Sequence, residues 1–559
     1  MSLDTPQTGP RQGAFRRLAG LRAVADPWAL GALAVAALVL LPLASVLWLA
    51  LHPAENIWPH LVATTLPRYL TNTLVLAAGT GVLAAAVGTG AAWLVVMYRF
   101  PGARWLEWLL LAPLAIPAYV GAYALVDVLE YAGPVQVTLR GMTGWTSARD
   151  YWFPDIRARW AAVLVLAAAL YPYVYLLARA AFREQSGGAY EVARALGAGP
   201  WARFVRVGLP LARPAIAAGT AIVMMETVND FGTVEYFAVQ TLTTGIFTVW
   251  LDTRNAGGAA QIACVILGLI LVLALVERAG RRGGRVQQLG RAARPVVPIR
   301  LTGWQGLAAT LACSLPFAAG FVLPFCVIAW HAAEEPGRWV DPGLGRALWH
   351  TLSTGGAAAV ATVTAALFLV YGVRLAGRGT ARGLLPVTAL GYAAPGAVLG
   401  LGLLIPLAAA DNTVADAVLA LTGTDPGLLL TGGAAAVVLA YVVRFFAIGQ
   451  GAVDAALGRI PPSLPLAARA LGRTRGGALR AVHLPLIRGS LSTALLLVFV
   501  DCVKELPATL LLRPFNYDTL ATRVHEQASL ERIGEASPPA LLVIAVGLCA
   551  VAVLARANR

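Results

Sequence analysis

Runs of about twenty apolar residues recur along almost the whole chain, and short polar segments separate them. A helix needs about this length to cross a hydrocarbon core of roughly 30 Å. The pattern predicts an all-α polytopic membrane protein with about twelve spanning helices. We expect them at residues 28–51, 71–98, 109–129, 159–181, 214–237, 259–276, 305–330, 348–373, 385–410, 429–450, 489–512 and 538–555. The fifth and eleventh runs contain charged residues and are the least typical of lipid-facing helices.

The composition agrees with this pattern, because 58% of the residues are hydrophobic, 13% are charged and the mean hydropathy is +0.71. The net charge of +15 raises the question of nucleic-acid binding. Most of the arginines, however, fall in alternate loops on one side of the predicted membrane. This asymmetry predicts that both termini are cytoplasmic, and it explains the basic charge without nucleic acid.

The chain contains an internal duplication. Asn72-Thr73-Leu74 matches His350-Thr351-Leu352, and Pro117 matches Pro395, both at an offset of 278 residues. Each half has six spans, so the two six-helix repeats are predicted to be parallel. The predicted divisions are a cytoplasmic N-terminal segment (1–27), a first transmembrane domain (28–276), a basic cytoplasmic linker (277–304) and a second transmembrane domain (305–559). Anionic membrane lipid is a candidate partner of the linker.

A basic loop is present once in each half, at residues 182–213 and 451–488. The first copy reads Glu191-x5-Gly197-x9-Val207-x-Leu209-Pro210. The second reads Gly472-x9-Val482-x-Leu484-Pro485, with Leu466 at the position of the glutamate. Small residues permit close approach, the glycine permits a sharp exit from a helix, and Leu-Pro predicts a rigid entry into the next span. A helix that only anchors the loop in the interface explains one copy, but not a matched pair. The pair predicts docking of another subunit.

The motifs of common catalytic sites are absent from the sequence. A Walker A loop needs a lysine, and the single lysine, Lys504, lies within an apolar span. HExxH, GxSxG and paired CxxC motifs are also missing. We therefore expect a non-enzymatic chain that binds no cofactor of its own.

Charged residues within the fifth and eleventh spans form a second repeated pattern. Glu226 and Asp230 are spaced i, i+4, and so are Asp501 and Glu505, which places each pair on one helix face. Charges at membrane depth usually face a wet pathway, so these four residues and Lys504 are candidates to line a translocation path. The four carboxylates are also weak candidates for metal ligands. The alternative is a structural network that supports two helices broken near Gly232 and Pro507.

The spacing of the repeated loop resembles the EAA loop of ATP-binding cassette (ABC) importer permeases of type I. The resemblance implies a coupling helix that docks on a cytoplasmic ATPase, two copies of that ATPase carrying ATP and magnesium, and an external substrate-binding protein. The implied coupling residues are Glu191, Ala193, Gly197, Leu209 and Pro210 in the first loop, and Ala468, Gly472, Leu484 and Pro485 in the second. Because Leu466 replaces the expected acid, the two docking sites are not expected to be equivalent.

A narrower resemblance comes from ETVNDFGTVEYF and KELPATLLLRPFNYDTLATRVHEQAS, which are similar to segments of fused iron(III) ABC permeases. It implies ferric iron as the substrate, with thiamine, polyamine or phosphonate as alternatives. Tyr119, Tyr123 and Tyr131 are then candidates for phenolate ligands, although packing in an aromatic belt is the favoured interpretation. An ion-coupled secondary transporter and a membrane scaffold or sensor are the alternatives of a different class.

Overall fold

The structure, a computed structural model, describes residues 27–282, 297–376, 378–389, 391 and 394–557. Within these residues, 11 helices are long and apolar enough to cross a membrane. A bent pair of helices, Ala103–Ala115 with Ala118–Thr143, brings the number to 12. The predicted all-α polytopic fold is confirmed.

The first half contains a helix for each predicted span and several short helices between them; 3₁₀ and π turns are labelled η. Its elements are α2 (Pro27–Leu51), α3 (Trp58–Ala63), α4 (Leu66–Met97), β1 (Tyr98–Arg99), α5 (Ala103–Leu109), η1 (Ala112–Ala115), α6 (Ala118–Leu129), α7 (Pro134–Thr143), α8 (Arg159–Glu184), α9 (Gly187–Ala195), α10 (Pro200–Arg203), η2 (Phe204–Gly208), α11 (Leu209–Asn229), α12 (Gly232–Tyr236), α13 (Leu242–Phe247), η3 (Thr248–Asp252) and α14 (Ala256–Arg282).

The second half repeats this order. Its elements are β2 (Ile299–Arg300), α15 (Gly303–Phe317), η4 (Ala318–Val322), α16 (Leu323–Glu334), η5 (Pro336–Val340), α17 (Pro342–Ala376), α18 (Arg378–Thr388), α19 (Gly396–Thr422), α20 (Ala435–Gly458), α21 (Ser463–Ala470), α22 (Arg475–Ala478), η7 (Leu479–His483), α23 (Leu484–Val503), α24 (Pro507–Leu512), α25 (Leu520–Ser529) and α26 (Ile533–Ala557).

Hydrogen bonds repeat with the sequence. The Thr73 hydroxyl accepts a hydrogen bond from the backbone N–H of Leu242 at 3.0 Å, and the Thr351 hydroxyl accepts one from Leu520 at 2.8 Å. Matching capping boxes begin α13 at Thr241 and α25 at Thr519. The sequence duplication is therefore also a duplication of the tertiary contacts.

Two predicted spans are broken by proline. The third span, expected at 109–129, bends by 93° between Ala115 and Ala118. Pro117 and Pro395 both have extended backbone, with ψ of 140° and 150°, and each directly precedes a helix. Proline disfavours the helical conformation in the residue before it, so the predicted continuous spans 109–129 and 385–410 are wrong at this point.

The first helix of each half packs against the opposite half. α2 lies along α17 and α19, and α16 lies along α6. Trp28 of α2 stacks on Phe368 of α17 with ring centroids 4.8 Å apart and meets the edge of Tyr371 at 5.0 Å. The hydrophobic pattern predicts these helices but not which half they cover.

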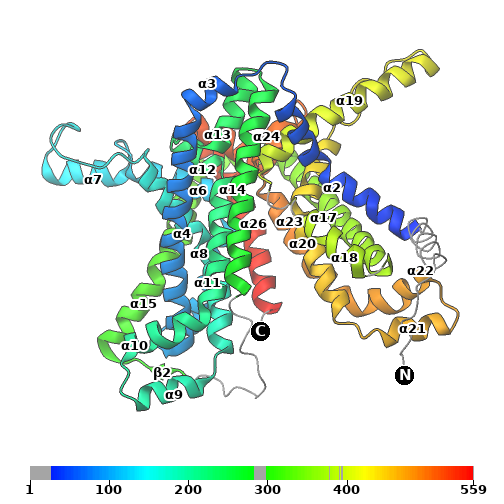
Figure 1. The fold of residues 1–559 in the computed structure, drawn as a ribbon. Helices are drawn as coiled ribbons and strands as arrows, with labels where there is room; N and C mark the ends of the chain where they lie inside the picture. Colours follow the sequence, from blue (N-terminus) through cyan, green and yellow to red (C-terminus); the bar gives the residue numbers. More distant parts are fainter. Residues whose placement is uncertain (1–26, 283–296, 377, 390, 392–393, 558–559) are drawn as a thin grey trace, which may run out of the picture.

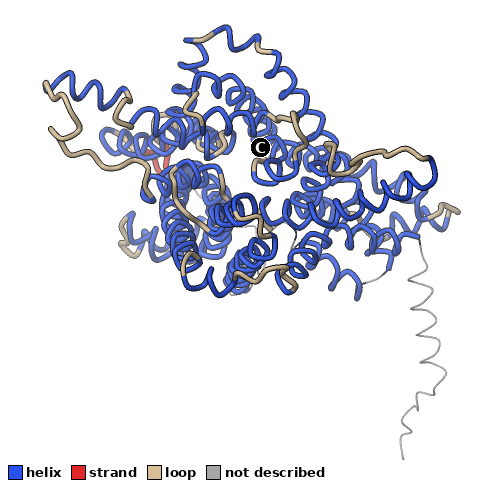
Figure 2. The backbone as a smooth tube through the Cα atoms, turned by 90° about the horizontal axis from the view of Figure 1, so that it is seen from above, coloured by secondary structure: helices blue, strands red, loops and turns tan. Residues whose placement is uncertain are grey.

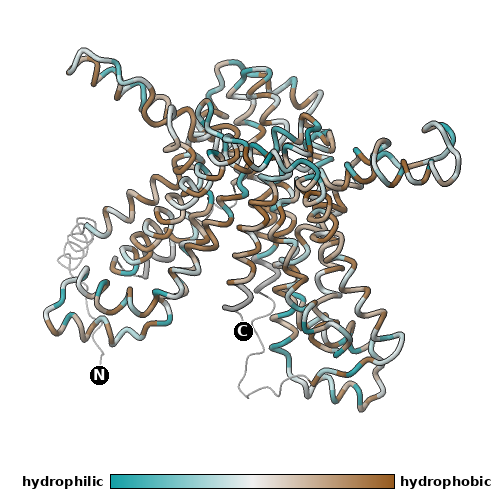
Figure 3. The backbone as a smooth tube through the Cα atoms, turned by 180° about the vertical axis from the view of Figure 1, so that it is seen from behind, coloured by the Kyte–Doolittle hydropathy of each residue, from teal (hydrophilic) through white to brown (hydrophobic). Residues whose placement is uncertain are grey.

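The two halves meet at one end of the molecule and diverge toward the other, where α9 and α10 end one half and α21 and α22 end the other (Figure 1). A view at right angles shows the helices gathered in two groups around the middle (Figure 2). Apolar residues predominate along the long helices, and polar residues gather at the diverging ends and in the lateral arms formed by α7 and the end of α19 (Figure 3).

The predicted N-terminal segment lies outside the described residues except for Pro27, as do 283–296 of the predicted linker. Helix α14 continues to Arg282, within the predicted linker 277–304. At its other end, Ile299 and Arg300 pair in parallel with Tyr98 and Arg99, which attaches the start of the second half to the end of α4.

Candidate functional site

The two repeated loops have the same backbone geometry. Gly197 and Gly472 both have φ of +82°, and each follows the end of a short helix. The Gly197 N–H donates to Arg194 O at 3.0 Å and the Ala198 N–H donates to Ala193 O at 2.9 Å; Gly472 and Arg473 make the equivalent bonds. This pair of bonds is a Schellman motif, which needs a left-handed residue after the helix. The requirement explains both glycines.

The two helices present exposed apolar side chains. In the first loop Val192 is 61% exposed and Leu196 is 82% exposed; in the second, Leu466 is 60% exposed and Leu471 is 85% exposed. Glu191 is exposed as well. Both loops lie at the same end of the molecule (Figure 1), as parallel repeats require.

The loops continue directly into the next long helix. Leu209-Pro210 lies within the helix that enters the next span, because residues 200–229 form one helix, and so do residues 475–503. A π turn immediately precedes each Leu-Pro, at Phe204–Gly208 and Leu479–His483. The wider π turn shifts the hydrogen-bond register just before the proline, where a backbone donor is missing. Each loop is therefore connected to the span that follows it by a continuous helix.

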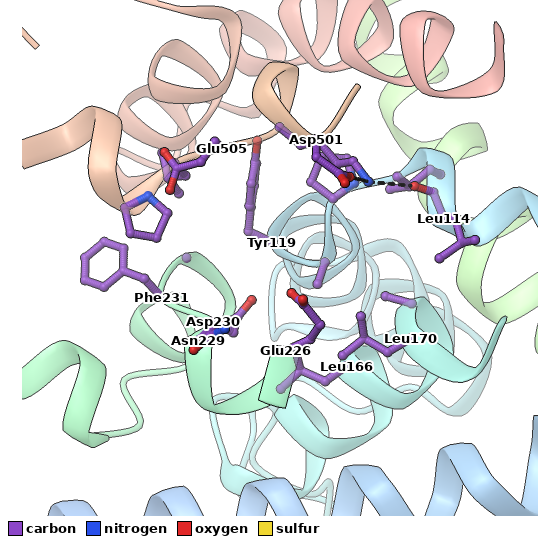
Figure 4. Close-up of a pocket in the computed structure, with 18 of the residues that line it drawn as sticks. Leu114, Tyr119, Leu166, Leu170, Glu226, Asn229, Asp230, Phe231, Asp501 and Glu505 are labelled. Carbon is purple, nitrogen blue, oxygen red and sulfur yellow. Dashed lines mark hydrogen bonds and ion pairs between the residues drawn. The ribbon is translucent and has the colours of Figure 1, made fainter. Parts of the chain in front are cut away.

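All five predicted pathway residues line one cavity between the halves (Figure 4). The cavity has a volume of about 170 Å³. Its polar lining consists of Tyr119, Tyr173, Glu226, Asn229, Asp230, Arg444, Asp501, Lys504 and Glu505. It lies at the far end of α11 and α23 from the loops, about 30 Å along each helix at 1.5 Å per residue.

Two of the carboxylates cap short helices. Asp230 accepts hydrogen bonds from the backbone N–H groups of Thr233 (3.0 Å) and Val234 (3.1 Å). Glu505 accepts them from Ala508 and Thr509, both at 3.1 Å. The hydroxyls of Thr233 and Thr509 also donate to the same two carboxylates. These bonds stabilise the N-termini of α12 and α24 just after α11 and α23 are interrupted.

The other two carboxylates differ between the halves. Asp501 forms an ion pair with Lys504 at 3.1 Å, and the Lys504 ammonium also approaches Leu114 O at 3.5 Å. Glu226, at the equivalent position in the first half, points into the cavity (Figure 4). The described residues contain no group of three or more histidine, cysteine, aspartate or glutamate side chains arranged to hold a metal ion.

Comparison with known proteins decides the class of the molecule. Residues 78–283 match the family model described as the inner membrane component of binding-protein-dependent transport systems. The chain is thus similar to the permease subunits of ABC importers. The match covers the first repeated loop and the helices on either side of it.

Among similar proteins, the Fe(3+)-transport system permease protein FbpB 2 of Haemophilus influenzae is 24% identical, over 85% of the permease and 87% of the relative. The molybdenum transport system permease protein ModB of Escherichia coli is 29% identical over 34% of the permease and 86% of its own length. The sulfate transport system permease protein CysT of the same organism is 28% identical, over 44% and 90% respectively. The permease is thus a multi-pass inner-membrane protein.

Sequence reasoning missed two residues of the cavity. Arg444 of α20 lies 3.7 Å from the Glu505 carboxylate, and Asn229 ends α11 with 6% of its surface exposed. Arg444 is a single charge within an apolar run, and this isolated charge could have identified it as a cavity residue from the sequence. Asn229 has no such signal, except that it aligns with Lys504 in the duplication.

A network of polar contacts joins the two halves of the permease at the end opposite the loops. Arg157 pairs with Glu130 of its own half at 3.0 Å and with Glu531 of the other half at 2.8 Å. His331 contacts Asp127 across the same junction at 2.9 Å.

His525 extends this network toward the cavity. It is within 3.1 Å of the Tyr123 hydroxyl and 3.1 Å of Glu235, both in the first half. Tyr123 lies one turn along α6 from Tyr119, which lines the cavity. Tyr131, the third predicted tyrosine, instead lies beneath the guanidinium of Arg140, 4.0 Å from its ring centroid.

Proposed function

We propose that this permease imports ferric iron delivered by an external binding protein, and that two cytoplasmic ATPase subunits drive the transport. ATP and magnesium bind to those subunits, and both termini of the permease face the cytoplasm. This chain supplies the path and the two coupling loops but no catalytic group.

The charge of the cavity supports a cation as the transported substrate. Four carboxylates line it, from Glu226, Asp230, Asp501 and Glu505, against two basic side chains, Arg444 and Lys504. An excess of carboxylate in a partly buried site favours a cation and opposes an oxyanion. This argues against the molybdenum and sulfate named for two of the relatives.

The extent of the likeness supports iron in particular. The iron(III) permease relative aligns with most of both halves, whereas the molybdenum and sulfate permease relatives each match less than half of the chain. The fused arrangement of two permease halves in one chain is therefore common to this protein and the iron(III) relative.

The continuous helices support a mechanism of coupling. Residues 200–229 connect the first loop to Glu226 and Asn229 in the cavity wall, and residues 475–503 connect the second loop to Asp501. If closure of the ATPase subunits draws the two loops together, α11 and α23 move as levers and rearrange the cavity. Transport then follows from rocking of the two halves about the junction.

The test is the ATPase activity of the complete importer in lipid vesicles. Ferric-loaded binding protein is expected to stimulate ATP hydrolysis and uptake of iron, and thiamine-, molybdate- and sulfate-loaded binding proteins are not. Stimulation by one of the other loaded proteins, without stimulation by the ferric form, would overturn the assignment to iron. A control with ferric citrate and no binding protein tests whether delivery is required.

A further inference from the structure

Two oxygen atoms in the cavity lining are buried without a protein partner among the described residues. They are the hydroxyl of Tyr119, which is 5% exposed, and the side-chain oxygen of Asn229, which is 6% exposed. A buried polar atom without a partner is destabilising, because it has lost its hydrogen bonds to water and gained none in the protein. Such atoms therefore call for an explanation, and a ligand or ordered water is the usual one.

Neither of these two residues has an equivalent oxygen-bearing side chain in the second half. At the offset of 278 that relates Pro117 to Pro395, Tyr119 corresponds to Ala397, which has no polar side chain. At the offset of 275 that relates Glu226 to Asp501, Asn229 corresponds to Lys504. The second half thus has neither oxygen donor, and its carboxylate Asp501 is balanced by Lys504 at 3.1 Å.

The other carboxylates of the cavity have structural contacts. Asp230 and Glu505 each accept three hydrogen bonds within their own short helices. They contribute negative potential, but their oxygens are committed to α12 and α24. The neutral oxygens that remain to meet a substrate come from the first half.

We propose that Tyr119 and Asn229 form a transient contact site for the hydrated cation as it passes, with Glu226 on the same wall. This inference rests on the proposed function and assigns the substrate site to one half of a duplicated cavity. Hard cations prefer oxygen ligands and often keep part of their water shell. The cavity has room for several water molecules, so each contact can be direct or through water. A site made of a few neutral oxygens binds weakly enough to release the ion.

Tyr119→Phe removes only the hydroxyl and is the central test. The matched control is Tyr171→Phe, because the Tyr171 hydroxyl is also buried without a partner in the described part of the chain but does not line the cavity. Uptake of radioactive iron from loaded binding protein is measured with the complete importer in vesicles. We expect Tyr119→Phe to slow uptake about tenfold, the effect of losing one contact to a charged group, and Tyr171→Phe to resemble the wild type.

A second pair of variants tests Asn229. Asn229→Leu removes the side-chain oxygen and is expected to slow iron uptake. Asn229→Asp keeps an oxygen at this position and is expected to keep the wild-type rate of uptake. Stimulation of the ATPase by loaded binding protein should survive in every variant, which separates substrate contact from loss of folding.

The outcomes distinguish the two proposals. If the wild type takes up no iron, the proposed function fails. If it takes up iron but Tyr119→Phe and Tyr171→Phe have equal rates, or Asn229→Leu and Asn229→Asp have equal rates, only the assignment of the contact site is overturned.

Discussion

Asp230 and Glu505 occupy equivalent positions in the two halves, and each carboxylate accepts the first backbone N–H groups of the short helix that follows. The interrupted helix ends at Asn229 in one half and at Val503 in the other. The sequence alone predicted all four carboxylates, including Glu226 and Asp501, to line the translocation path. The hydrogen bonds of Asp230 and Glu505 show that these two also cap short helices.

We expect Asp230→Ala and Glu505→Ala each to lower the stability of the purified permease by about 1–2 kcal/mol, the usual cost of losing a cap. Thermal unfolding in detergent measures the effect. Asp230→Asn keeps an acceptor for the backbone and should be milder than the alanine variant. Full stability of both alanine variants, combined with loss of iron uptake, would show that the two carboxylates act as ligands instead.

The glycines that end the loop helices are expected to be required for coupling. Gly197→Val and Gly472→Val place a β-branched residue at φ of +82°, a conformation that costs at least about 1–2 kcal/mol. Stimulation of the ATPase by loaded binding protein should fall strongly while the protein still inserts. Gly199→Ala is the control, because Gly199 has φ of −65° and no neighbour that an added methyl group would meet. Coupling at wild-type level in both valine variants would remove the docking assignment.

The two loops should bind the ATPase with different dependence on salt. Glu191 is charged and exposed, whereas Leu466 at the same position in the second loop is apolar and 60% exposed. Salt screens exposed charges, so the affinity of the wild-type loop for the ATPase should fall as the salt concentration rises. In Glu191→Leu we expect this affinity to fall less steeply with salt. Leu466→Ala should lower affinity without changing its salt dependence. Affinity measured at several salt concentrations tests both, and equal salt slopes in all three proteins would argue against a charge contact at Glu191.

The network of polar contacts at the end opposite the loops should hold the two halves together when no substrate is present. Arg157→Ala removes the bridge between Glu130 and Glu531, so we expect more ATP hydrolysis in the absence of binding protein. A hydrogen bond from Arg157 to Glu130 raises the pKa of the guanidinium above its usual range. The arginine therefore keeps its charge even at alkaline pH, and salt is expected to weaken the network more than alkali.

A double-mutant cycle isolates the contact between the halves. Arg157→Ala and Glu531→Ala should have non-additive effects on basal hydrolysis, with a coupling energy below about 1 kcal/mol because Glu531 is largely exposed. Purely additive effects would mean that the pair does not connect the halves in the working importer.

Much of the fold was predictable because the solvent is lipid. Apolar runs of fixed length give the spans, and the duplicated prolines, threonines and loops give the two parallel halves. The positions of the helix breaks were harder to predict from the sequence. Proline at 117 and 395 interrupts the helix, but the equally conspicuous Pro210 and Pro485 do not, because a π turn precedes each of them. The choice between these outcomes depends on the surrounding packing.

The sequence by itself determined that the chain is an all-α membrane protein with a duplicated basic loop and no Walker lysine, since hydropathy, the repeat and the residue types each follow from local chemistry. It also pointed to Glu226, Asp230, Asp501, Lys504 and Glu505 as charged residues within the spans, although it missed Arg444. Only the tertiary structure decided that α2 and α16 each cover the opposite half, and that Tyr119 faces the same cavity as Asp501. These contacts join segments hundreds of residues apart, and no periodicity along one helix specifies which distant helix its buried face will meet.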